Sequence, residues 1–209
     1  MRAGQTTILE ISDDVIRFAQ VRADKDRLTV VQSRVLNRAG AGPLTAADVS
    51  GLPVEDFEGR EVVLVLPRRV VFFCRFDLPS AQPDEIRRMI GLQIGRHVPY
   101  SRDRVVFDFS PLGHNQDGYS RVLAAAVSRD YVEQVLQVLR ARGLQVQRVL
   151  VSSLCLLDCY QGLWSGSDDQ TVLLLSLWEG SGEICFIRAG QLVMSRALCW
   201  LAGMKAGPQ

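Results

Sequence analysis

Apolar and polar residues alternate with a period of two through most of the first 36 positions, which is the pattern of half-buried β-strands. The alternation predicts strands at Thr6–Ile11, Val15–Val21 and Leu28–Leu36, separated by turns that contain aspartate. Because such tight turns join antiparallel neighbours, we expect a three-stranded meander. Small residues dominate 40–53, where the pattern allows a short helix at 44–48.

The stretch 61–143 has the pattern of a compact α+β module. We expect a strand on either side of a Pro-Arg turn at 67–68, a helix at 83–96, strands at 105–109 and 119–127, and a helix at 128–142. The first helix has Pro83 in its first turn and an apolar stripe at helical spacing. Ser128 is the expected N-cap of the second helix, and Gly143 is its expected left-handed stop.

The rest of the chain repeats the pattern of its beginning. A strand at 146–151 and an apolar helix near 153–163 come first, followed by a solvated loop at 166–169 that we take as a domain boundary. Three more strands are then predicted, at 171–178, 183–188 and 192–198. The two ends of the chain are therefore expected to hold similar strand meanders.

Composition excludes several classes of protein. The 24 basic and 23 acidic residues give a net charge of +1, so there is neither the basic stripe that binds nucleic acid nor a polybasic cluster for anionic lipid. No apolar run approaches the roughly 20 residues of a membrane-spanning helix. Charged strands follow the N-terminus at once, which argues against a secretory signal. The odd count of five cysteines predicts reduced thiols of a cytosolic protein, with Cys74, Cys155 and Cys185 in the core.

The usual residues of catalysis and metal binding occur without their partners. Asp13 and Asp14 can be metal ligands, but aspartate also favours turns, and we prefer the turn interpretation. His97 and His114 are the only histidines, and no cysteine or carboxylate stands at ligand spacing from them. No serine nucleophile motif is present. We therefore predict no catalytic residue and no metal site.

Several short motifs between 61 and 158 together resemble the PilM family of type IV pilus assembly proteins. The resemblance extends to a relative of that family, the cytoplasmic part of the GspL protein of type II secretion. The motifs are Val-Leu-Pro at 65–67, Leu-Pro-Ser at 78–80, Asp-Glu-Ile at 84–86, Val-Pro-Tyr at 98–100, Phe-Asp-Phe at 107–109 and Leu-Ala-Ala-Ala-Val at 123–127. The helix at 135–144 and the stretch 149–156 continue the match.

The resemblance implies an α+β or α/β chain with an actin-like fold, which is related to RNase H and to FtsA. In that arrangement, 1–60 and 144–168 form the first lobe, 61–143 is an inserted subdomain, and 169–209 begins an incomplete second lobe. Members of such families bind ATP and magnesium between two complete lobes.

Two turns that hold phosphate in the family differ in this sequence. The family pattern Asp-Ile-Gly falls on Glu10, Ile11 and Ser12, and the next two residues are Asp13 and Asp14. The second phosphate turn falls on Ser176, Leu177 and Trp178, where an indole replaces glycine. Carboxylates repel phosphate, and a side chain blocks the close backbone approach that glycine allows. We therefore expect no cofactor and no ATP hydrolysis, with an actin-like ATP-binding protein as the alternative.

The resemblance also implies a partner. PilM-like proteins take a short N-terminal peptide of the bitopic inner-membrane protein PilN into a groove beside the inserted subdomain. The residues expected to line that groove are Arg68, Arg75, Tyr100, Phe107 and Phe109. The arginines can instead be charges that protect an edge strand, and the phenylalanines can be ordinary core. We expect a cytoplasmic scaffold held at the inner membrane through this partner, with the assembly ATPase as a further contact, or alternatively a fragment that folds only in its first lobe.

Overall fold

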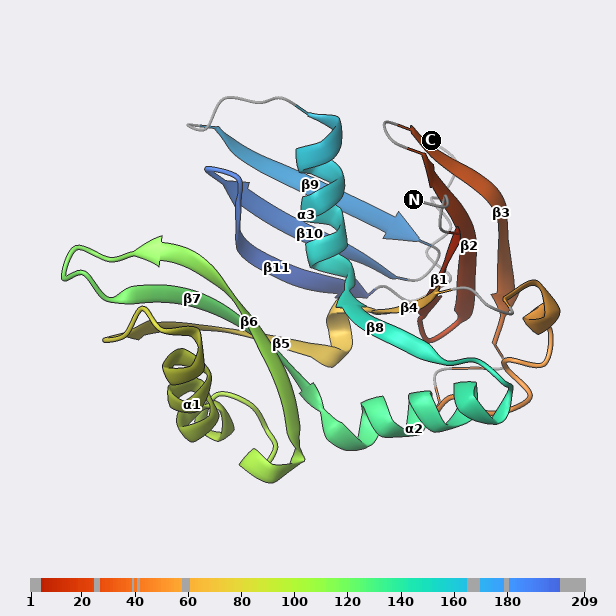
Figure 1. Ribbon diagram of the computed structural model, residues 1–209, viewed down its shortest axis with the longest axis horizontal. Coiled ribbons are helices and arrows are strands. Elements are labelled where there is room, and N and C mark those ends of the chain that lie inside the picture. The colour runs from red at the N-terminus through yellow and green to blue at the C-terminus, as the bar shows by residue number, and fades with distance from the viewer. Residues whose placement is uncertain are drawn as a thin grey trace, which may run out of the picture. The chain divides into compact units, whose positions relative to one another are not determined.

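The computed structural model describes residues 5–24, 27–38, 40, 42–57, 61–164, 170–178 and 181–199 (Figure 1). The chain divides into two compact units, Met1–Val151 and Ser152–Gln209. The first unit contains two sheets, and the second unit contains one.

The first sheet has the strand order β3-β2-β1-β4-β8. Its strands are β1 (Gln5–Ile11), β2 (Val15–Asp24), β3 (Arg27–Asn37), β4 (Glu61–Leu66) and β8 (Val146–Val151). The first three are antiparallel, which confirms the predicted meander. β4 pairs in parallel with both β1 and β8, so the middle of the sheet changes from antiparallel to parallel.

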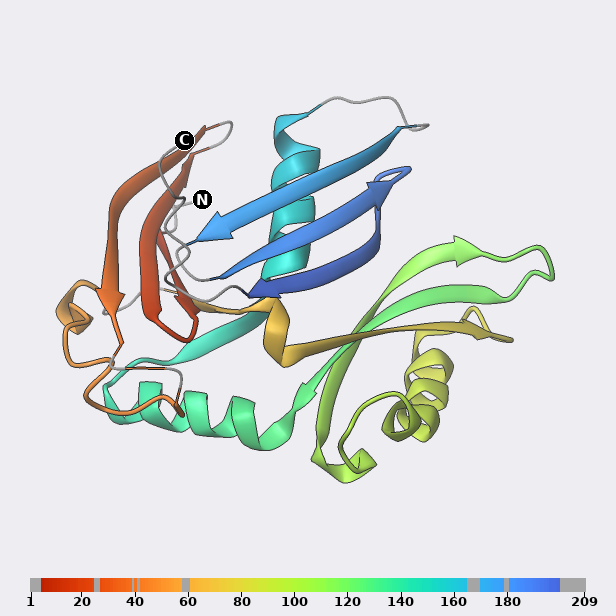
Figure 2. The same ribbon diagram turned by 180° about the vertical axis from the view of Figure 1, so that it is seen from behind.

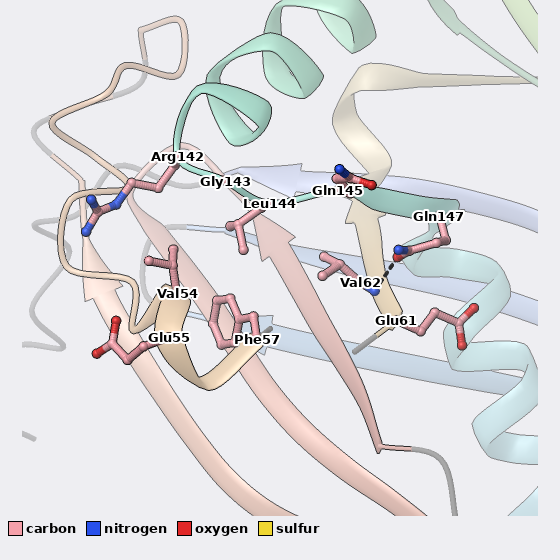
Figure 3. Close-up of a pocket in the computed structure, with 10 residues that line it drawn as sticks. All are labelled: Val54, Glu55, Phe57, Glu61, Val62, Arg142, Gly143, Leu144, Gln145 and Gln147. Atoms are coloured by element: carbon pink, nitrogen blue, oxygen red, sulfur yellow. Dashed lines mark hydrogen bonds between the residues drawn. The ribbon is translucent and has the colours of Figure 1, made fainter. Parts of the chain in front are cut away.

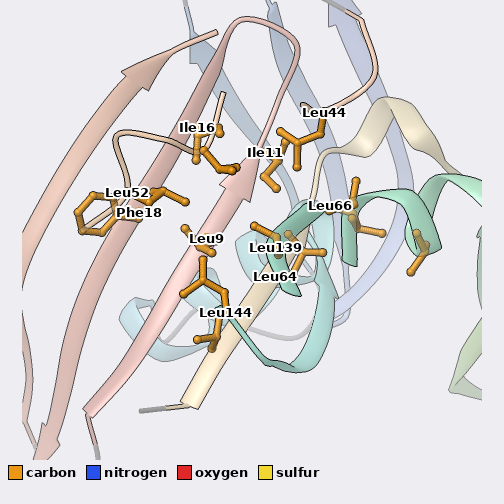
Figure 4. Packing of buried hydrophobic residues seen from close by; sticks show 14 of the residues in the cluster. Leu9, Ile11, Ile16, Phe18, Leu44, Leu52, Leu64, Leu66, Leu139 and Leu144 are labelled. Atoms are coloured by element: carbon orange, nitrogen blue, oxygen red, sulfur yellow. The ribbon is translucent and has the colours of Figure 1, made fainter. Parts of the chain in front are cut away.

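One face of this sheet packs against α2 (Arg129–Ala141), and their side chains form the main core (Figure 4). Alternate residues of β1 point into this core, and Leu9 is fully buried there. Gly143, at φ +86°, ends α2, and the Leu144 amide donates to the Leu139 carbonyl at 2.9 Å. This left-handed stop was predicted from the sequence, and it points Leu144 back into the core.

The short helix that we allowed at 44–48 is absent: residues 44 and 45 are irregular, and residues 46–50 form turns. Thr45 and Asp48 bond each other as in a capping box: the Thr45 amide and hydroxyl both donate to the Asp48 carboxylate at 2.8 Å. A 3-10 helix, η1 (Val54–Phe57), follows, and the Phe57 ring lies edge-on to Phe18 at 5.5 Å. The segment thus adds buried side chains to the core without an α-helix.

The second sheet has the strand order β5-β7-β6 and carries α1 on one face (Figure 2). Its elements are β5 (Val71–Leu78), α1 (Pro83–Gln93), β6 (Val105–His114) and β7 (Ser120–Ser128). Three short 3-10 helices, η2 (Arg68–Val70), η3 (Ile94–Arg96) and η4 (Arg102–Arg104), join them. The predicted stripe of α1 is confirmed, because Ile86, Ile90 and Ile94 are buried against the sheet.

The structure corrects the predicted bounds of the inserted module, 61–143. β4 belongs to the first sheet, and α2 packs into the core of the first sheet, so the separate small sheet spans only 71–128. The Pro-Arg turn at 67–68 therefore leads from one sheet to the other instead of joining paired strands. The physical reason lies in β4, whose residues 62–66 are all buried, as in a central parallel strand covered on both faces.

The second unit contains α3 (Ser152–Leu163) and the strands β9 (Thr171–Trp178), β10 (Ser181–Arg188) and β11 (Gln191–Cys199). The strands form an antiparallel sheet in the order β11-β10-β9, as predicted. The unit begins at Ser152, so α3 belongs to it and not to the first lobe that we had extended to 168. The predicted boundary loop at 166–169 lies outside the described residues.

Candidate functional site

The turn between β1 and β2 uses its polar groups internally. The amide and the hydroxyl of Ser12 both donate to the Val15 carbonyl at 3.0 Å. Arg38 crosses the turn: its side chain donates to the Ser12 carbonyl at 2.6 Å, and its amide donates to the Asp14 carbonyl at 2.7 Å. The Ser12 amide is therefore not available to a phosphate oxygen in this arrangement.

Glu10 and Asp13, two of the acidic residues at this turn, are paired with arginines. Glu10 faces Arg17 across the two strands, with 3.3 Å between the charged atoms, and Asp13 pairs with Arg69. A polyphosphate would have to approach these carboxylates and compete for their arginines. The residues of this turn do not fit a nucleotide phosphate. Within the described ranges, no three His, Cys, Asp or Glu side chains are placed to hold a metal ion.

The residues of the second predicted phosphate turn, Ser176 and Trp178, lie on β9 in the second unit. Ser176 is half-buried and stands opposite Glu183 of β10. Trp178 ends the strand opposite Ser181 and is 42% exposed. A buried carboxylate beside Ser176 and an indole at the strand end are both unlike a phosphate cradle.

Glu183 forms a buried polar cluster that the sequence analysis missed. Its carboxylate, on a residue only 5% exposed, accepts hydrogen bonds from Ser152 at 2.6 Å, from Ser195 at 3.2 Å and from Ser153. Ser152 and Ser153 form the start of α3, where the helix dipole favours a negative charge. The cluster therefore fixes the N-terminus of α3 to the β10–β11 hairpin.

The cysteines are free thiols, and Cys74 and Cys185 are buried as predicted, whereas Cys155 is half-buried. Burial, and then the neighbouring Glu183 carboxylate, raise the pKa of Cys185 to about 12. A thiol with this pKa is almost entirely protonated at neutral pH, so Cys185 is an inert core residue. Its position beside Glu183 gives no nucleophile.

The five residues predicted to bind a partner are divided between the two sides of the second sheet. Tyr100, Phe107 and Phe109 lie on the α1 side and pack against its core cluster. The Tyr100 ring meets Phe72 edge-on at 5.8 Å. These three side chains contribute to the core, as the alternative interpretation held.

Arg68 and Arg75 belong to the other side, which we call the α1-free face and define by Phe73, Arg75, Leu123 and Ala125. The Arg68 guanidinium lies 4.9 Å above the Phe73 ring, and Arg75 stands opposite Leu123. Ala125 packs against the core of the first sheet, so this face meets the first sheet near η2. β5 is also an edge strand, which agrees with the alternative role of Arg75 as a protecting charge.

Arg87 was missed because it stands between the apolar stripe residues of α1. Its guanidinium lies 5.9 Å from the Phe107 ring centroid and 5.4 Å from that of Phe109. It also pairs with Asp108 at 2.5 Å. Arg87 therefore covers the outer edge of β6. No sequence pattern distinguishes it from its exposed neighbour Arg88.

A cavity of about 830 Å³ opens at the beginning of β4, beside η1 and the end of α2 (Figure 3). Two of its charged lining residues make contacts within the chain: Glu61 pairs with Arg148 at 2.7 Å, and Arg142 donates to the Ser50 carbonyl at 2.9 Å. Ligands of parallel sheets bind beyond the carboxyl ends of the strands, whereas this cavity lies at their amino ends. It is therefore not the candidate site.

Among the described residues, neither histidine belongs to a group of side chains that could hold a metal ion. His97 packs edge-on against Phe76 at 4.9 Å, and His114 ends β6 as an exposed residue.

Among the described helices, none is both long enough and apolar enough to cross a bilayer.

Comparisons with known proteins agree with this architecture. The sequence profile of the family described as type IV pilus assembly protein PilM matches residues 56–203, well over half of the chain. A search of curated protein sequences gave no match. Among solved structures, a PilM-PilN type IV pilus biogenesis complex superposes with a TM-score of 0.76 at 19% identity, covering 94% of this chain and 61% of the matched chain. The chain described here thus spans less than two thirds of that relative's length.

Two further structures have the same fold. The cytoplasmic domain of EpsL, an inner-membrane component of the type II secretion system of Vibrio cholerae, matches with a TM-score of 0.66 at 14% identity, covering 94% of this chain and 71% of that one. A Bacteroides thetaiotaomicron protein of unknown function with an actin-like ATPase fold matches at 0.59 and 10% identity, covering 95% and 71%. The predicted actin-like fold is confirmed, and the chain belongs to the family of the type IV pilus assembly protein PilM.

Proposed function

We propose that this protein is a scaffold of the inner-membrane platform of a type IV pilus or a type II secretion system. It binds the cytoplasmic segment of a bitopic, PilN-like membrane protein and does not hydrolyse ATP. The observation that carries the proposal is membership of the PilM family together with the similarity to a PilM-PilN complex. In this role the protein is cytoplasmic and reaches the membrane through its partner.

The α1-free face beside η2 is the surface that we propose for the partner segment. Phe73 offers a half-buried ring, Arg68 holds its guanidinium over that ring, and Arg75 is exposed one position further along the same face. An extended segment with apolar and acidic side chains suits a strip of aromatic and cationic groups. Tyr100, Phe107 and Phe109 support this sheet from the α1 side.

The variants that test this surface avoid the core. Phe73→Glu and Arg75→Glu should each weaken capture of the PilN-type tail in a pull-down, because they remove the ring or reverse the charge. Phe107→Ala is unsuitable alone, since it empties core space and destabilises the fold. Arg148→Glu, on the distant strand β8, is the matched charge-reversal control. Equal capture by the two test variants and the wild type would remove this face from the proposal.

Thermal unfolding tests whether the protein binds ATP, which hydrolysis would require. A ligand that binds only the native state raises the melting temperature, by the equivalent of about 2.7 kcal/mol at a hundred times its Kd. We expect no shift between zero and millimolar Mg-ATP, because the β1–β2 turn does not fit a phosphate. A rise of several degrees that requires magnesium would establish the actin-like ATP-binding alternative instead.

The assembly ATPase is the further contact that we propose for the scaffold. Co-purification of that ATPase with the protein in the presence of the PilN-type tail is the expected result. Co-purification in the absence of both the tail and membranes would show a direct contact, and its absence in both conditions would remove the ATPase from the proposal.

A further inference from the structure

The outer edge of β6 has an open set of backbone hydrogen-bonding groups. β6 ends the order β5-β7-β6, so only one of its edges is paired among the described residues. In an antiparallel strand, successive residues point their N–H and C=O groups alternately toward and away from the neighbour. The carbonyls of Val105 and Phe107 accept bonds from arginine side chains at 3.4 Å and 3.5 Å, so these residues point away from β7.

The same alternation places Phe109 and Pro111 on the outward set. Proline has no N–H to donate. At an outward position this costs no hydrogen bond between β6 and β7. The register with β7 becomes irregular between Pro111 and Gly113. The stretch that can accept another strand is therefore 105–109.

Two exposed arginines cover this stretch, and one of them, Arg129, is also held by a hydrogen bond to the Asp103 carbonyl at 3.1 Å. Arg87 donates to the Phe107 carbonyl and Arg129 donates to the Val105 carbonyl, both at the long limit of a hydrogen bond. The arginine side chains are 52% and 47% exposed, and their ion-pair partners Asp108 and Glu133 are more exposed still. Exposed pairs of this kind contribute about 0–1 kcal/mol, so backbone N–H groups of an incoming strand can replace them.

The side chains at this edge define what kind of strand fits. The Phe107 and Phe109 rings lie under Arg87, and the next turn of α1 presents Gly91, where a Cβ would meet the Phe107 ring at 3.7 Å. α1 and Arg87 therefore cover these half-buried rings, and an incoming strand meets the backbone edge of β6 and the arginine side chains. The two guanidinium groups lie beside Asp108 and Glu133 in exposed ion pairs, and once displaced from the carbonyls they can exchange these partners for carboxylates of the incoming strand, whereas they repel a basic segment.

We propose that the 105–109 edge of β6 is a docking strand for an extended acidic segment of another protein, which adds as a fourth strand and receives Arg87 and Arg129 on its carboxylates. Backbone pairing supplies affinity, and the carboxylates supply selectivity. This surface is distinct from the α1-free face proposed for the PilN-like tail. Binding at one surface therefore does not depend on binding at the other.

The test uses the full chain and a fluorescein-labelled nine-residue peptide of alternating valine and glutamate, with a valine–lysine peptide as control, at about 50 mM salt, where charge effects are strong. We expect the acidic peptide to bind and the basic peptide not to bind. The double variant Arg87→Glu, Arg129→Glu should weaken binding by about tenfold or more. Arg88→Glu is the matched control, because Arg88 is exposed on α1 and donates to the Asp84 carbonyl of its own helix at 3.2 Å.

Amide hydrogen exchange followed by NMR locates the peptide. The outward amides of Phe107 and Phe109 should slow on binding, whereas that of Asp108, which points toward β7, should not change. Circular dichroism of the double variant should match the wild type, since both arginines are surface residues. Absence of binding, equal binding of the basic peptide, or binding without protection of these two amides would each overturn the proposal.

Discussion

At the scale of single residues, the Glu183 cluster shows how hydroxyl groups satisfy a buried acidic side chain in this protein. Three serine hydroxyls donate to the carboxylate, and Ser153 also lies 2.9 Å from the Ser195 hydroxyl. Ser153 is fully buried, so water cannot replace it without rearrangement. A buried acceptor that loses a donor costs about 1–3 kcal/mol.

Ser153→Ala should therefore lower the free energy of unfolding by about 1–3 kcal/mol, because it leaves part of a buried carboxylate unsatisfied. Urea denaturation followed by tryptophan fluorescence, which reports on the second unit, is the measurement. Ser110→Ala, at an exposed position of β6, should change stability by less than about 0.5 kcal/mol. If Ser153→Ala were as stable as the wild type, the cluster would have no role in holding α3.

At the scale of elements, the segment 44–50 shows how a local hydrogen-bond pattern replaces a helix. The burial of Asp48 would raise its pKa, but the Thr45 amide and hydroxyl and the Arg38 guanidinium outweigh burial and lower the pKa below its model-compound value of 3.8. A carboxyl with a lowered folded-state pKa stabilises the fold above its unfolded pKa, and this contribution disappears as pH falls through the folded pKa.

Asp48→Asn should thus destabilise the protein by about 1 kcal/mol at pH 7. The difference should shrink progressively below about pH 4, where the unfolded carboxyl takes up its proton, and should disappear only once pH has also passed the lower pKa of the folded state. Chemical denaturation of both proteins at pH 7 and near pH 3 measures the difference. A constant difference at the two pH values would contradict an electrostatic role and would indicate packing instead.

The two meanders also differ as elements, although they have the same strand order. Leu9 of β1 is fully buried beneath α2, whereas Leu175 of β9 is 54% exposed. The two leucines occupy equivalent positions, because each stands one residue before a predicted phosphate turn, which begins at Glu10 in one case and at Ser176 in the other. The face of β1 that is buried in the core of the first sheet thus corresponds to a face of β9 that is apolar but exposed among the described residues.

Leu9→Ala should cost about 2–5 kcal/mol because it opens a cavity, whereas Leu175→Ala should cost less than about 0.5 kcal/mol. Thermal and urea unfolding of the two variants provide the comparison. A large loss of stability for Leu175→Ala in the isolated chain would show that its face is covered in solution.

The elements themselves could be predicted because alternation and capping are local signals. The meander strands, the α1 stripe and the Gly143 stop were all predicted from neighbouring residues. The sheet to which each strand belongs could not be predicted, because β4 meets β1 through pairing between residues that lie far apart in sequence. The apolar run of β4 was an available signal for a central parallel strand, and it was interpreted as part of a hairpin.

At the scale of the whole molecule, the family and the actin-like fold were recognised from a series of weak motifs whose order was informative. The partner residues were less predictable. Phe107 and Phe109 share a face of their strand, and the sequence cannot say whether that face is core or surface; the structure places it against α1. Arg87 and Glu183 act through contacts across long sequence separations, and neither has a local pattern.

The measurement that tests the central claim most directly is a titration of the labelled cytoplasmic tail of the PilN-type protein from the same organism, followed by fluorescence anisotropy. The account predicts saturable binding with a Kd of tens of micromolar or tighter, about −6 kcal/mol or stronger, and the same Kd with and without Mg-ATP. Absence of binding at 100 µM tail, or binding that requires ATP, would contradict it.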